Sequence, residues 1–197
     1  MEAQAFVDRL VQRLPRLPPT DYVFFHWAHG GKPTEEGFGM APVAGMNAAK
    51  VIDAIWDVGH YVGNVEHVRE CRVVSDPRYT GDKQRFYQRV DIPLLGAIHH
   101  ELVFHRLGNR QGYEILAWEM LKTETDALSA KDYARSEYNV GAWLVGNGAL
   151  GYALSSAPRR DDVGFLKFKA LTSGADAAAS RVVKANIEGM ARWAARR

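Results

Sequence analysis

The residues with the clearest chemical potential lie in one stretch, HHELVFH, at positions 99–105. It holds three histidines and a glutamate, side chains that can ligate metals and transfer protons. Zinc peptidases use H-E-x-x-H on a helix, which places both imidazoles on one face. From His100 the pattern is H-E-x-x-x-H, one residue too long, so the stretch does not carry that motif.

Read as a strand, the same stretch divides into two faces, because successive side chains point to opposite sides. One face carries His99, Glu101 and His105, and the other carries His100, Leu102, Phe104 and Arg106. His99 and His105 are then about 20 Å apart, too far to share one ion. We expect a polar outer face, with Leu102 and Phe104 turned to the core, and no metal site.

A second candidate cation site combines Asp53, Asp57 and His60, which fall on one side of a helix that Asn47 can cap. The same helix turns Val51, Ile55 and Trp56 to the opposite side, so amphipathicity alone demands polar residues here. Gly59 also disturbs the helix before His60. We interpret these side chains as a solvated face.

Other signals of chemistry are weak. The single cysteine, Cys71, lies in a strand-like segment and excludes an internal disulfide; we expect a buried thiol and a cytoplasmic protein. No G-x-S-x-G elbow is present, and the glycines of GNGALG (146–151) separate two strands as a hairpin turn does. We therefore predict no catalytic residue and no cofactor.

Charge and hydropathy limit the partners. The net charge is +2, and lysines and arginines are scattered, which argues against nucleic acid as a partner. Charged residues interrupt every apolar run near the N-terminus, so we expect no signal peptide and no transmembrane segment. Transient contact with a membrane is compatible with this composition, and the oligomeric state is left open.

The spacing of apolar residues predicts the elements that position these side chains. A helix is expected over 3–14, where prolines stop it, and the apolar segment 21–33 reads as a strand. EEGFGMAPVAG (35–45) reads as a loop, and a helix begins near Asn47. A long helix over 175–196 carries an apolar stripe of Val183, Ile187, Met190 and Ala194.

Between these helices the sequence has the period of β-structure. We predict seven strands: RECRVVSD, QRFYQRVDI, AIHHELVFHR, GYEILAWEML, EYNVGAWLVG, ALGYALSS and VGFLKFKAL. Short turns separate them, which favours an antiparallel meander. A curved sheet with one large helix buries both apolar faces when it wraps around that helix, so we expect an α+β protein.

This order resembles the helix-grip fold of the START-like, or SRPBCC, superfamily, which includes the pollen-allergen-like proteins. The resemblance covers residues 21–195 and rests on AAKVIDAIWDVGHYVGNVEHVREC, FYQRVDIPLLGAIHHELVFHR and the C-terminal helix. The helix before the first strand and the long 29–45 segment depart from the family pattern. We expect one START-like domain over 1–197, with residues 1–19 as an N-terminal helical extension.

The resemblance implies a hydrophobic cavity between the sheet and the last helix, holding a lipid, sterol or polyketide-like molecule. Two alternatives remain: a polyketide cyclase or aromatase of the same fold, and a protein-interaction module that uses the sheet or the N-terminal helix. We favour a non-catalytic ligand-binding protein. Its expected ligand-binding residues are Tyr87, Arg89, Phe104, Trp118, Trp143, Asn186 and Met190.

Overall fold

The computed structural model describes residues 1–15, 17–92, 96–172 and 176–197. Its centre is one eight-stranded sheet with the strand order β1-β2-β8-β7-β6-β5-β4-β3. The strands are β1 (Val23–Ala28), β2 (Glu35–Pro42), β3 (Val68–Val73), β4 (Lys83–Ile92), β5 (Gly96–Arg110), β6 (Tyr113–Met120), β7 (Ala134–Gly146) and β8 (Ala149–Pro158). Neighbours in this order are antiparallel, and a short parallel pairing also joins β5 to β7.

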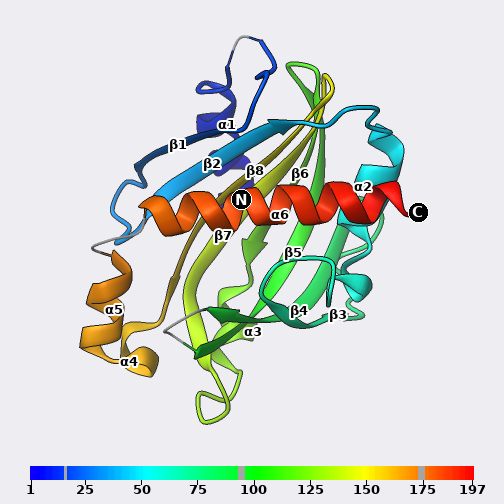
Figure 1. Cartoon of the computed structure of the whole chain (residues 1–197). Coiled ribbons are helices and arrows are strands. Elements are labelled where there is room, and N and C mark those ends of the chain that lie inside the picture. Colours follow the sequence, from blue (N-terminus) through cyan, green and yellow to red (C-terminus); the bar gives the residue numbers. More distant parts are fainter. Residues whose placement is uncertain (16, 93–95, 173–175) are drawn as a thin grey trace.

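Helices lie on both faces of this sheet. They are α1 (Glu2–Val11), α2 (Ala48–Trp56), the 3-10 turn η1 (Val58–His60), α3 (Lys122–Asp126), α4 (Arg160–Val163), α5 (Phe165–Thr172) and α6 (Asp176–Ala195). The sheet curves around α6, which crosses its concave face beside α2, while α1 lies behind the sheet (Figure 1). The expected α+β helix-grip architecture is confirmed.

The apolar stripe on α6 explains why this helix lies across the concave face. Val183, Ile187, Met190 and Ala194 are each at most 3% exposed and share one core with α2 and the strands. The approach to β2 is close, because a Cβ on Gly39 would lie 2.4 Å from Val183 Cγ1. The start of this helix was expected at Ala175, which lies outside the described residues.

Helix α1 covers the convex face with an apolar stripe of its own. Phe6 and Leu10 are fully buried against strands at the centre of the sheet, and Glu119 Oε2 accepts the backbone N–H of Ala3 at 2.7 Å. At its other end, Arg9 Nη2 donates to the buried Glu36 carboxylate at 2.6 Å. The chain therefore buries the apolar face of α1 against its own sheet, which removes one basis for the interaction-module alternative.

Two segments differ from the sequence prediction. EEGFGMAPVAG was expected as a loop, but Glu35–Pro42 is strand β2, paired with β1 and β8. Its glycines, which suggested a loop, leave room for side chains such as Phe24 and Val183. VGFLKFKAL was expected as a strand, but Phe165–Thr172 is helix α5, because a short apolar run does not distinguish the two.

Candidate functional site

The concave face carries a row of aromatic rings that runs across the middle of the sheet. Phe86 and Phe104 stack at 5.2 Å between ring centroids, Phe104 meets Trp118 edge-on at 5.7 Å, and Trp118 and Trp143 each contact Tyr152, at 5.5 and 4.5 Å. All five rings are at most 8% exposed. Strand alternation brings them to one side, so five strands, β4 to β8, together form an aromatic wall facing α6.

A polar cluster lies on this apolar face beside the aromatic row. His100 on β5 contacts Ser136 Oγ through Nδ1 at 2.8 Å and Gln88 Oε1 through Nε2 at 3.1 Å. Asn139 Oδ1 accepts the Trp118 indole N–H at 2.8 Å, and Asn139 Nδ2 lies 3.5 Å from His100 Nε2. We call Gln88, His100, Ser136 and Asn139 the concave polar cluster.

His100 is neutral in this environment. The imidazole is 1% exposed, and burial, followed by the nearby His99, lowers its pKa to about 3. The Gln88 carbonyl oxygen requires a proton on Nε2, so Nδ1 is the acceptor for the Ser136 hydroxyl. The residue therefore holds its neighbours in place without introducing a charge.

This buried histidine should make stability depend on pH. Between pH 6.5 and pH 3 the unfolded chain binds a proton at His100 that the folded chain does not. The free energy of unfolding should therefore fall by up to about 1.4 kcal/mol per pH unit as the pH drops through that window. Urea titrations of wild type and His100→Gln at several pH values measure the difference, with the exposed His60→Gln as control. Parallel curves for wild type and His100→Gln would contradict the assignment.

Five of the seven residues expected from the sequence lie between the concave face and α6. Phe104, Trp118 and Trp143 belong to the aromatic wall, and Met190 of α6 is fully buried in the same core. Asn186 also lies on α6, but its Oδ1 accepts the backbone N–H of Glu66 at 3.2 Å. Asn186 therefore fixes the segment after η1, and its role toward a ligand remains a prediction.

Tyr87 and Arg89 lie on the opposite, convex face. The Tyr87 hydroxyl contacts His99 Nδ1 at 3.2 Å, and the Arg89 guanidinium stacks 4.7 Å from the Tyr133 ring. Both have the strand parity opposite to Phe86 and Gln88, whose side chains face α6. The sequence prediction placed them between the sheet and the last helix, whereas both side chains lie on the face away from α6.

The stretch HHELVFH alternates as expected, but its polar side is buried. His99, Glu101 and His105 lie on the convex face and are 4–5% exposed. Glu101 accepts from Arg85 at 3.0 Å, and His105 lies 3.3 Å from Glu119, the residue that anchors α1. The expected polar outer face is the side on which these residues lie, but α1, α3 and the Tyr133 ring cover it.

His100, Ser136 and Asn139 were not among the expected site residues. Strand alternation had already put His100 on the face of Leu102 and Phe104, but His100 was not counted among the expected ligand-binding residues. Asn139 could have been placed there too, because it has the parity of Trp143. Ser136 could not, because a register shift between Ser136 and Tyr138 breaks the alternation along β7.

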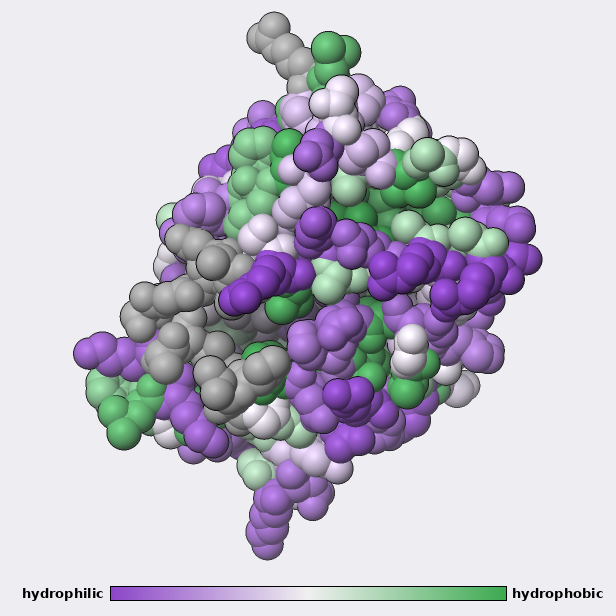
Figure 2. Space-filling model, in the orientation of Figure 1, coloured by the Kyte–Doolittle hydropathy of each residue, from purple (hydrophilic) through white to green (hydrophobic). Residues whose placement is uncertain are grey.

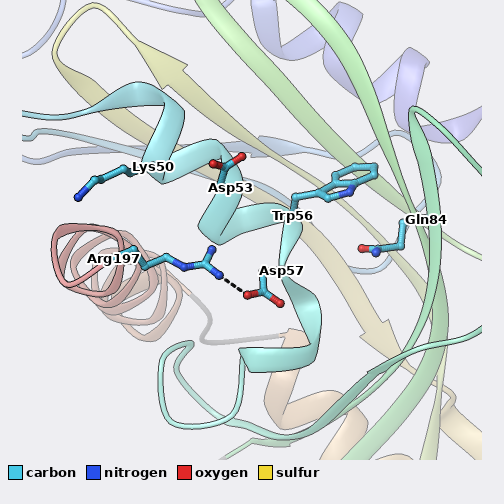
Figure 3. Close-up of a pocket in the computed structure, with 6 residues that line it drawn as sticks. All are labelled: Lys50, Asp53, Trp56, Asp57, Gln84 and Arg197. Atoms are coloured by element: carbon cyan, nitrogen blue, oxygen red, sulfur yellow. Dashed lines mark hydrogen bonds and ion pairs between the residues drawn. The ribbon is translucent and has the colours of Figure 1, made fainter.

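Asp53 and Asp57 line an open pocket of about 490 Å³ between α2, the end of α6 and β4 (Figure 3). Arg197 forms an ion pair with Asp57, which also contacts His60 at 2.8 Å. Within the described ranges, no three His, Cys, Asp or Glu side chains are arranged to hold a metal ion. The two acids therefore lie on the polar face of the helix, where Asp57 contacts Arg197 and His60.

A serine and a histidine also meet on the convex face. Ser155 Oγ lies 2.8 Å from His29 Nδ1, and His29 Nε2 lies 3.6 Å from Glu36 Oε1. Arg9 of α1 contacts both His29 and Glu36, and Ser155 is 1% exposed. A substrate cannot reach this serine, so the cluster serves to anchor α1.

Cys71 is buried, as expected, and its side chain belongs to the core on the concave side. Burial raises the pKa of its thiol to about 12. It remains protonated at neutral pH and is a poor nucleophile.

The fold of this chain is similar to that of several solved structures, although its sequence is not similar to a known family. No family model matches the sequence, and no curated protein matches it. Among solved structures, human StAR-related lipid transfer protein 5 aligns with a TM-score of 0.72 and 11% identity over 98% of this chain and 95% of that one. A STAR-related lipid transfer protein fragment from Xanthomonas axonopodis gives 0.69 and 14%, over 90% and 95%. Human STARD10 gives 0.68 and 11%, over 98% and 79%.

These alignments cover 90–98% of this chain. Their sequence identities, 11–14%, support a conclusion about the fold only. They agree with the strand order and with a C-terminal helix across the concave face. The chain therefore has the START-like helix-grip fold.

Proposed function

We propose that the chain binds an apolar small molecule, of the lipid, sterol or polyketide type, between the concave face of the sheet and α6. The observation that carries this proposal is the combination of an aromatic wall with the uncharged concave polar cluster on one buried face. Ligand sites in proteins are mostly apolar and contain a few placed polar groups. The names of the aligned proteins, which describe lipid transfer, support the same proposal.

The binding energy in this proposal comes from the removal of apolar surface from water. A ligand that buries about 300 Å² of its apolar surface gains about 7.5 kcal/mol, from which the cost of association must be subtracted. Phe104, Trp118, Trp143 and Met190 supply the apolar contacts in this scheme.

Binding, rather than catalysis, is the function that the polar cluster supports best. A general base works well when its pKa lies near the working pH, and His100 has a pKa of about 3. Both imidazole nitrogens also have partners within the protein. We therefore place the cyclase alternative second, and we keep the cytoplasm as the proposed location.

Exchange of such a ligand requires contact with the membrane that supplies it, and we propose that α4 and α5 make this contact. In the described part of the chain, no helix is long and apolar enough to span a membrane. Phe165 and Leu166 are nevertheless 56% and 81% exposed at the start of α5. Arg160 lies over the Phe165 ring and Lys167 is exposed nearby, so cations border this hydrophobic patch (Figure 2).

The test of ligand binding uses the tryptophans of the aromatic wall. Protein purified from cells is extracted with organic solvent, the extract is identified by mass spectrometry, and the extracted protein is titrated with the compound found or with 2-tridecanone. We expect saturable binding that changes tryptophan fluorescence in wild type and in Trp27→Phe, whose ring lies on the convex side beside Glu36. In the double variant Trp118→Phe/Trp143→Phe the change should largely disappear.

Two results would contradict the proposal. One is a folded protein that yields no apolar compound and binds none of the apolar molecules offered. The other is a fluorescence change that depends on Trp27 and is unaffected by the double variant.

A further inference from the structure

The polar groups on the concave face form a cluster without charge. His100, Ser136 and Asn139 are 1–8% exposed, and in the part of the chain that the structure describes no charged side chain hydrogen-bonds to or ion-pairs with them or with Gln88. Charged residues near this face lie toward solvent. Arg106, which stacks 4.5 Å over the Trp56 ring, is an exposed example.

The hydrogen bonds within the cluster leave one donor group without an acceptor. Ser136 donates to His100 Nδ1, and His100 Nε2–H donates to Gln88 Oε1. Trp118 donates to Asn139 Oδ1 at 2.8 Å. The Asn139 amide nitrogen then faces an N–H group at 3.5 Å, which cannot accept its hydrogens. Asn139 therefore offers N–H donors beside the aromatic wall.

We infer that the ligand presents an uncharged hydrogen-bond acceptor, such as a ketone or ester carbonyl oxygen, to the side-chain amide of Asn139. This inference rests on the proposed function and narrows it to one ligand class. A carboxylate or phosphate would be buried without a cation, which is costly, whereas recognition of such anions normally employs arginine or lysine. An alkane would leave the Asn139 donors unpaired.

The experiment compares three ligands that differ only at one end: 2-tridecanone, tridecane and dodecanoate. Each is delivered from cyclodextrin at pH 8, and affinity is measured by tryptophan fluorescence. For wild type we expect the ketone to bind about 5-fold more tightly than the alkane, the equivalent of one net hydrogen bond. Dodecanoate should bind at least about 10-fold more weakly than the ketone, because its charge has no partner.

Variants at position 139 test whether Asn139 is responsible. Asn139→Leu should lose the preference for the ketone over tridecane. Asn139→Asp keeps an oxygen for Trp118 but lacks the N–H donors, so it too should lose that preference. Thermal unfolding confirms that each variant is folded. The wild-type comparison by itself tests whether the ligand presents an uncharged acceptor, and equal binding of the three ligands overturns the inference even if neither variant folds.

The outcomes separate this inference from the proposed function. If dodecanoate binds as tightly as the ketone, or if all three ligands bind equally, the inference is wrong and the proposed function stands. A ketone preference that persists in a folded Asn139→Leu protein also overturns it. If none of the three ligands binds to wild type, the proposed function itself fails.

Discussion

Replacing Gly141 with alanine should destabilise the protein by about 2–3 kcal/mol, although strand propensity alone favours the substitution. A Cβ at this position would lie 2.2 Å from Trp118 Cζ2 and 2.4 Å from the backbone oxygen of Ala153. Neither atom belongs to the far end of a flexible chain, so strand β7 or the indole ring must shift. The missing side chain at Gly141 therefore leaves the space that the Trp118 ring occupies.

Urea unfolding followed by fluorescence measures this effect. Gly30→Ala is the matched control, because no atom lies within 4 Å of a Cβ built there, and its stability should change by no more than about 0.5 kcal/mol. The second substitution Trp118→Phe removes the nearer clash and should recover part of the loss. An unchanged stability in Gly141→Ala would mean that Trp118 and β7 are not in close contact at this position.

The double variant Phe165→Asp/Leu166→Asp should bind vesicles about 30- to 100-fold more weakly than wild type, which corresponds to about 2–3 kcal/mol of lost apolar burial. Both side chains are largely exposed, so their removal costs the fold little and acts on the membrane-bound state. Cosedimentation with phosphatidylcholine vesicles that contain one-fifth phosphatidylserine is the measurement. Added salt should weaken wild-type binding, because Arg160 and Lys167 border the patch.

Val73→Asp is the control for this variant. Val73 is also an exposed apolar side chain, 51% exposed, but it lies on the edge strand β3 and not on α5. It should bind vesicles as wild type does. Equal vesicle binding by wild type and the double variant would exclude α5 as the contact surface and would leave the proposed ligand site unaffected.

Several features of the fold could be predicted because they follow from local periodicity. The stripe on α6 at Val183, Ile187 and Met190 has helical spacing, and alternation along β5 assigned Leu102 and Phe104 to the core. The period of a segment depends on its own residues, so no knowledge of distant contacts was required. Where the period was too short or interrupted by glycine, as in α5 and β2, the sequence prediction failed.

Other features depend on elements that meet only in the folded chain. His99 and His105 have a polar strand pattern, yet both are buried, His99 against the Tyr133 ring and His105 beside Glu119, which holds the first turn of helix α1. The placement of Tyr87 on the convex face follows from the pairing of Gln88 with His100, which fixes the parity of β4 relative to β5. A bulge in β7 then brings Ser136 to the face that Asn139 and His100 share.

The sequence by itself therefore determined which segments have an apolar side and that a sheet must wrap around the last helix. The tertiary structure decided which polar residues share the concave face and which are sealed beneath α1. The physical reason is that side-chain period is local, whereas burial and hydrogen-bond partners depend on strand register and on the helices that cover each face.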